Sequence, residues 1–198
     1  MDIIQENHKC PYCQCELDIV PKRKKKCPHC GGFIFVRNGR LITEDDANIE
    51  DWLVRLAQFR ITKAEFDSNR QNLSKQFGSL ASINDTVWRI LNEEVLKRRS
   101  FHDVEMAYYE MARLASTEDK DPKPFCAEAL RTQLTELKTQ GVKIVKIVGY
   151  GMRNDSSCRK CRSLHGKKFD IEVALRELPI PTVCEDELGC KCSYVRAD

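Results

Sequence analysis

The sequence has no long apolar run and no apolar leader. No stretch approaches the roughly 18 consecutive apolar residues that a membrane-spanning helix requires, and residues Met1–Lys9 lack the apolar centre of a secretory signal. We therefore expect a cytoplasmic protein that does not interact with membranes. Cytoplasmic thiols stay reduced, so paired cysteines in such a protein indicate metal binding or redox chemistry rather than disulfides.

Several common catalytic signatures are also missing. The chain contains no phosphate-binding loop, no nucleophile elbow, no dinucleotide fingerprint and no His-x-Glu of the zinc deaminases. It has 4 histidines, and His165 is the single plausible general base among them. A zinc-linked nuclease that uses His165 is therefore the remaining enzymatic alternative. Otherwise we expect a non-enzymatic protein that acts by binding.

Cysteine is abundant, with 11 residues, and the first group of four has the spacing of a zinc site. It consists of Cys10-Pro-Tyr-Cys13 and Cys27-Pro-His-Cys30. A Cys-x-x-Cys turn directs two thiolates toward one point about 2.3 Å from each sulfur, and two such turns complete a four-coordinate shell. We therefore predict a zinc ribbon over residues 1–43, with Cys15 and His29 as spare candidate ligands.

This N-terminal segment needs the metal in order to fold. It contains few large apolar side chains, and units below about 40 residues rarely fold without a metal or a disulfide. Residues 16–20 and the basic run fit a hairpin whose tip is basic, and Phe33–Val36 fits the closing strand. The basic run consists of Lys22, Arg23, Lys24, Lys25 and Lys26.

A second group of cysteines lies near the C-terminus. The spacing of apolar residues changes after Gly141. Residues 142–148 and 168–171 have the β-branched pattern of short strands, and residues 172–178 fit a short helix. Cys190 and Cys192 fit a closing strand on which alternate residues face the same side. Five cysteines and His165 compete here for the four positions of a second zinc ion. The cysteines are Cys158, Cys161, Cys184, Cys190 and Cys192.

The segment between the two cysteine groups has a helical pattern. Apolar residues recur at spacings of three and four, with capping residues such as Thr43 and glycines such as Gly78 at the ends. We therefore predict an α+β protein with three parts. These are a zinc ribbon (1–43), an all-helical domain (44–141) and a small C-terminal α/β zinc-binding unit (142–198).

The C-terminal motifs support a resemblance to a known family. They are Cys158-x-x-Cys161, Leu164-His-Gly166-Lys-x-Phe169, Leu178-Pro-Ile-Pro181 and Cys190-Lys-Cys192. Residues 150–195 thereby resemble the zinc-associated C-terminus of minor head, or head-morphogenesis, proteins of tailed bacteriophages. That family usually has Asp at His165, His at Cys184 and Arg at Lys191. The N-terminal motif resembles a common bacterial zinc ribbon. The two resemblances imply a bacterial or prophage origin.

The uneven distribution of charge favours two kinds of partner. The net charge is +4 over residues 1–40, −4 over 41–141 and +3 over 142–198. Clustered Lys and Arg on a rigid scaffold suit phosphate contacts, so DNA or RNA is one expected partner. The candidate contacts are the basic run together with Arg153, Arg159, Lys160, Arg162, Lys167 and Lys168. We therefore expect a nucleic-acid-binding or regulatory module. The alternative is a structural or protein-interaction protein, related to phage head morphogenesis, that docks a protein through the helical domain.

Overall fold

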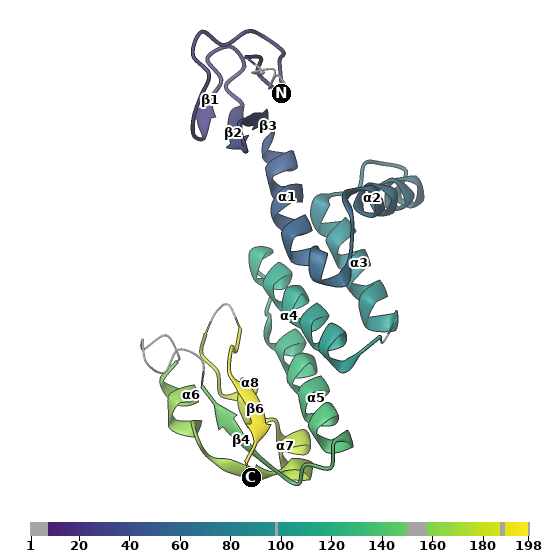
Figure 1. The fold of residues 1–198 in the computed structure, drawn as a ribbon, viewed down its shortest axis with the longest axis vertical. Coiled ribbons are helices and arrows are strands. Elements are labelled where there is room, and N and C mark those ends of the chain that lie inside the picture. The colour runs from purple at the N-terminus through teal and green to yellow at the C-terminus, as the bar shows by residue number, and fades with distance from the viewer. Residues whose placement is uncertain (1–7, 98, 150–157, 187–188, 198) are drawn as a thin grey trace, which may run out of the picture. The chain divides into compact units, whose positions relative to one another are not determined.

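The computed structural model describes residues 8–97, 99–149, 158–186 and 189–197 (Figure 1). Over these residues the chain combines helices with two three-stranded sheets. It divides into two compact units, residues 1–83 and 84–198. That boundary falls inside the segment 44–141, so the three-part division made from the sequence stays a prediction. None of the helices in the described part of the chain combines the length and the apolar character needed to cross a membrane.

The first unit begins with a small antiparallel sheet in the order β1-β2-β3. Its strands are β1 (Lys25–Lys26), β2 (Phe33–Arg37) and β3 (Arg40–Ile42). The turn between β2 and β3 is Asn38-Gly39, and both residues have positive φ, 50° and 75°. An Asn-Gly pair favours this two-residue turn because both residues tolerate left-handed backbone.

The core under this sheet is small and contains cysteine. Its buried apolar residues are Leu17, Ile34 and Leu41, together with Cys10 and Cys27. Three large aliphatic side chains are a modest core for this segment. The packing therefore supports the expectation that the segment depends on a metal.

Helices follow the sheet in the first unit. They are α1 (Glu44–Leu56), the 3₁₀ turn η1 (Ala57–Phe59) and α2 (Lys63–Phe77). Thr43 caps α1 by accepting the Asp46 N–H, as the sequence predicted. Thr62 and Glu65 form a reciprocal capping box at α2, which ends at Gly78 in the left-handed conformation. Local capping therefore fixes both helices at the positions that the sequence indicates.

Three longer helices open the second unit. They are α3 (Ile83–Lys97), α4 (Phe101–Thr117) and α5 (Lys123–Thr139). Figure 1 shows α4 and α5 packed side by side, and their contacts are the most extensive between any two elements. Most of the apolar residues that the sequence predicts as core are at least partly buried here, including Leu114, Leu130 and Leu134, but Leu96 of the predicted α3 stripe is exposed.

A second antiparallel sheet follows in the order β5-β4-β6. The elements of this region are β4 (Ile144–Val148), α6 (Arg159–Leu164), β5 (Lys168–Asp170), α7 (Ile171–Glu177), α8 (Pro179–Thr182) and β6 (Ser193–Arg196). One core joins α5 to this sheet through Leu134, Val145, Ile147 and Tyr194, and four of the C-terminal cysteines belong to it. The C-terminal cysteines are thus part of a packed core.

Two local expectations differ from the structure. The basic run does not form a hairpin tip, because Lys25 and Lys26 pair with β2 as an edge strand. Cys190 and Cys192 do not lie on the closing strand, because β6 begins at Ser193, after both of them. Strand alternation is therefore not what brings these two sulfurs to the other cysteines.

Candidate metal centres

The N-terminal cysteine cluster, Cys10, Cys13, Cys27 and Cys30, has the geometry of a four-coordinate metal site. Its four sulfurs all lie within 4.8 Å of one another. The Cys10–Cys30 and Cys13–Cys27 sulfur pairs are 3.8 Å and 3.9 Å apart. A tetrahedron with metal–sulfur distances of about 2.3 Å has sulfur–sulfur edges of about 3.8 Å. The structure therefore brings together the four cysteines that the sequence paired, in an arrangement compatible with a metal ion.

The two turns that carry these cysteines have the same backbone construction. The Gln14 N–H donates to the Cys10 carbonyl, and the Gly31 N–H donates to the Cys27 carbonyl, both at 2.9 Å. Gln14 and Gly31 follow the second cysteine of each turn and have positive φ, 60° and 75°. Glycine at position 31 adopts this conformation without strain, as the sequence predicted. Local backbone geometry thus aims each pair of thiols at one point.

Tyr12 connects the N-terminal cysteine cluster to the first helix. Its hydroxyl accepts the Glu44 N–H at 2.8 Å. Its ring lies against Gly32, where an added Cβ would stand 2.9 Å from the Tyr12 ring. This contact explains why glycine suits position 32, and it ties the cysteine turns to the start of α1.

The electrostatics of the N-terminal cysteine cluster favour a bound cation. A hydrogen bond from the Cys30 backbone N–H lowers the pKa of the Cys27 thiol to about 6. The Gly32 N–H favours the thiolate of Cys30, but desolvation and the neighbouring thiols Cys13 and Cys27 oppose it and raise its pKa to about 12. The raised pKa of Cys30 means that its thiolate is disfavoured beside the neighbouring thiols when no cation is bound. A divalent cation would stabilise the four thiolates together.

The C-terminal cysteine cluster, Cys158, Cys161, Cys184, Cys190 and Cys192, forms two triads that share Cys161. Within each triad the sulfurs lie within 4.8 Å of one another. One triad is Cys158, Cys161 and Cys184, and the other is Cys161, Cys190 and Cys192. The Cys158–Cys184 and Cys161–Cys190 sulfur pairs are 3.9 Å and 3.8 Å apart, again the edge length of a tetrahedral site.

The C-terminal cysteine cluster is more enclosed than the N-terminal one. All of its members are buried except Cys158, which is half-buried. Cys158 caps α6 and its sulfur accepts the Cys161 N–H at 3.4 Å. Burial opposes the thiolate of Cys158, but N–H groups of Glu185 and Cys161 outweigh it and lower its pKa. For Cys161 burial prevails and raises the pKa.

A sixth cysteine, Cys126 on α5, touches this cluster. The Cys190 N–H hydrogen-bonds to its sulfur, while burial raises the pKa of the Cys126 thiol to about 11. A Cβ added at Gly189 would stand 2.6 Å from that sulfur. The spacing of the cysteines in the sequence does not identify Cys126 as a neighbour of the cluster. The one signal in the sequence is that Cys126 shares the apolar face of α5 with Leu130 and Leu134, which pack into the core.

The other candidate ligands lie apart from the two clusters. Cys15 and His29 are exposed and belong to no described group of metal-ligating side chains. His165 is also exposed and outside these groups, and its Nδ1 accepts the Gly149 N–H at 3.1 Å. With Nδ1 engaged in this way, the neutral imidazole carries its proton on Nε2. Because Nε2 then already carries a proton, it cannot accept another one, so this tautomer does not suit a general base that acts through Nε2.

The cations of the basic run are exposed, and most have no acidic partner. Lys24 lies 3.8 Å from Glu44. No carboxylate within the described part of the chain pairs with Lys22, Arg23, Lys25 or Lys26. The ammonium groups of Lys24 and Lys26 lie over aromatic rings of β2.

The second basic group is more dispersed. Lys160 pairs with Glu185 at 2.9 Å, and Arg162 also has a partner. Arg159, Lys167 and Lys168 are exposed. Arg153 lies outside the described residues. The structure therefore leaves the basic run as the more concentrated group of unpaired positive charge.

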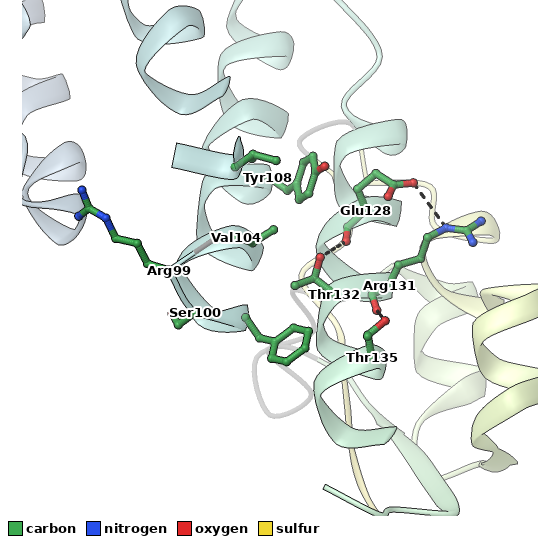
Figure 2. Close-up of a pocket in the computed structure, with 10 residues that line it drawn as sticks. Arg99, Ser100, Val104, Tyr108, Glu128, Arg131, Thr132 and Thr135 are labelled. Carbon is green, nitrogen blue, oxygen red and sulfur yellow. Dashed lines mark hydrogen bonds and ion pairs between the residues drawn. The ribbon is translucent and has the colours of Figure 1, made fainter. Parts of the chain in front are cut away.

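A pocket of about 570 Å³ lies in the second unit (Figure 2). It lies between α4 and α5 and is bordered by Val95 of α3. Its hydroxyl groups are engaged, since Thr132 and Thr135 donate to carbonyls of their own helix at 2.8 Å and 2.7 Å. Arg131 pairs with Glu128 at 3.5 Å. The described lining residues therefore assemble no nucleophile with a base.

Comparisons with known protein families, curated proteins and solved structures gave no match. The resemblance of residues 150–195 to phage minor head proteins accordingly rests on the motif residues alone. The cysteine geometry is thus the most informative feature of the molecule.

Proposed function

We propose that the protein binds two structural zinc ions, one in each cysteine cluster, and that it binds nucleic acid through its N-terminal part. Residues 1–43 would act as a zinc ribbon and residues 142–198 as a zinc-stabilised α/β unit. The motif resemblances favour a bacterial or prophage origin. The protein would act by binding, without catalysis.

The donor atoms support zinc and a structural role. Thiolates in tetrahedral sets select Zn²⁺ or iron–sulfur chemistry, and a closed shell of four thiolates is typical of structural zinc. A catalytic zinc keeps one position open for water, whereas each cluster here offers four or more sulfurs. The zinc would therefore hold the two segments in shape.

The exposed, unpaired cations of the basic run carry the nucleic-acid proposal. Ion pairs would neutralise such a run, yet Lys22, Arg23 and Lys25 have no carboxylate partner in the described structure. They project from a segment that the metal would hold rigid, so phosphate contacts would require little ordering of the backbone. Within the second unit, Arg159, Lys167 and Lys168 are further exposed cations that would be available for phosphate contacts of their own.

The test measures the salt dependence of binding with the full chain. Neutralising Lys22, Arg23 and Lys25 to Gln should flatten the slope of log K against log salt by roughly 2–3 units, because each phosphate contact contributes about 0.7–0.9. A matched control neutralises Lys75, Lys123 and Lys143, which are exposed and form no ion pair within the described part of the chain. The control should leave the slope unchanged. Absence of binding at about 50 mM salt would refute the proposal.

A protein-docking role is the second candidate, and exposed apolar side chains favour it. Val54 and Leu80 in the first unit and Leu96 in the second are each at least 77% exposed. Such residues in the helical segment could contact a protein partner. If nucleic acid does not bind at low salt while Val54→Ser or Leu96→Ser abolishes retention of a defined partner, this role would replace the first.

A further inference from the structure

One face of the first sheet combines an exposed aromatic ring, Phe33, and a half-buried one, Phe35, with lysines. Ile34 is only 1% exposed and packs into the core with the cysteines. Side chains alternate along a strand, so its neighbours Phe33 and Phe35 point to the opposite side of β2. Lys26 lies directly across from Phe33 in the β1–β2 pairing. We call Lys24, Lys26, Phe33 and Phe35 the Phe–Lys face.

The lysines of the Phe–Lys face sit on its rings. The Lys24 ammonium lies 4.6 Å from the Phe33 centroid and 4.3 Å from the Phe35 centroid. The Lys26 ammonium lies 5.1 Å from the Phe33 centroid. Phe33 nevertheless remains 39% exposed. A base that stacks on these rings would displace the ammonium groups that lie over them, and the displaced lysines would then be next to the phosphates of the same strand.

The geometry points to single-stranded nucleic acid as the ligand of the Phe–Lys face, with bases stacked on Phe33 and Phe35 and phosphates bound by the neighbouring cations. This inference rests on the proposed nucleic-acid binding and specifies its substrate class. Every base has an aromatic face, and stacking on protein aromatic rings beside basic residues is a general mode of binding single strands.

The spacing of the two rings favours a single strand over a duplex. Residues two apart on a strand are about 6.8 Å apart. Successive bases of a duplex are stacked about 3.4 Å apart, so two neighbouring bases can reach both rings only when the strand is unstacked and extended. In a duplex the base faces are also covered by their neighbours, which leaves only phosphate contacts available.

Charge supports the same ligand. Lys22 and Arg23 directly precede the Phe–Lys face in the chain and have no carboxylate partner in the described structure, whereas Lys25 pairs with Ile34 and so lies on the other side of the sheet. Glu44 is the acid that pairs with Lys24, at 3.8 Å and with both side chains about half exposed. A phosphate could replace this exposed and weak ion pair. Single-stranded DNA and RNA share the required chemistry.

The experiment compares a 20-nucleotide single-stranded DNA, an RNA of the same sequence and the corresponding DNA duplex. Phe33→Leu with Phe35→Leu keeps apolar side chains but removes the rings. We expect the double variant to lose about tenfold or more in affinity for either single strand, while its duplex affinity and its salt slope stay unchanged. A difference between the DNA and RNA arms would identify the preferred strand.

Two controls separate stacking from a general effect on folding. Phe33→Tyr with Phe35→Tyr keeps both rings and should retain single-strand affinity. Phe77→Leu, at another exposed ring on α2, should leave all affinities unchanged. Metal content equal to that of the unmodified protein verifies that the N-terminal segment is folded.

The outcomes distinguish this inference from the proposed function. If the Leu variant binds single strands as well as the unmodified protein does, stacking is wrong, although the electrostatic proposal stands. Equal losses in the Tyr and Leu variants would also overturn the role of the rings. If the unmodified protein binds neither strand nor duplex at low salt, both proposals fail.

Discussion

Substituting one N-terminal cysteine should release one metal and unfold only the segment around it. Cys27 is 2% exposed, and its sulfur lies 3.9 Å from that of Cys13. The core beside it has three large aliphatic side chains, Leu17, Ile34 and Leu41, each worth about 1.5–3 kcal/mol on burial. Zinc binding to such segments contributes about 10–16 kcal/mol at pH 7. The metal therefore dominates the stability of this segment.

The assay follows metal content and proteolysis together. In Cys27→Ser we expect one zinc equivalent in place of two, trypsin cleavage within the basic run, and little change in the helical circular dichroism. Cys15→Ser is the matched control, since Cys15 is exposed and outside the cluster. If Cys27→Ser retained both metals, or if the helices melted together with the N-terminal segment, the reasoning would be refuted.

The remaining predictions concern the C-terminal cysteine cluster and pH. Cys161 belongs to both triads, so Cys161→Ser should lose the second zinc. Cys192 belongs to one triad and to neither of the sulfur pairs Cys158–Cys184 and Cys161–Cys190, so elemental analysis should still find the second zinc in Cys192→Ser. Gly189→Ala should destabilise the second unit by roughly 1–3 kcal/mol more than Gly166→Ala in denaturant unfolding, because both glycines have positive φ but only the first Cβ would clash with Cys126. Equal losses would contradict that contact. The zinc affinity of the N-terminal cysteine cluster should rise with pH and fall toward acid, because a thiol with a raised pKa, such as Cys30, must release its proton to bind the metal. A zinc affinity that stays constant from pH 5 to 8 in competition with a chelator would contradict this.

Local signals made much of the structure predictable. The four N-terminal cysteines come together because each Cys-x-x-Cys turn is set by its own backbone, as the matching hydrogen bonds to the Cys10 and Cys27 carbonyls show. Thr43 and Gly78 likewise mark helix ends through interactions confined to a few residues. Periodicity located the helices because each buries one apolar face.

Features that depend on tertiary packing were not predictable. Cys126 meets Gly189 and Cys190 only because α5 packs against the C-terminal segment, a contact between residues more than 60 positions apart. Lys25 and Lys26 of the basic run pair with β2 because the turn at Cys27–Cys30 folds β1 back onto β2. A run of charged residues has no alternation of apolar and polar side chains, so the sequence did not indicate a strand there. The sequence indicated a strand over Phe33–Val36, but only the burial of Ile34 shows that Phe33 and Phe35 lie on its other face.

The metal content of the native protein tests the central claim most directly. Protein purified without added metal should contain two equivalents of zinc per chain by elemental analysis, with all 11 cysteines reduced by mass spectrometry. A metal content near zero, accompanied by disulfides within the two clusters, would contradict the account.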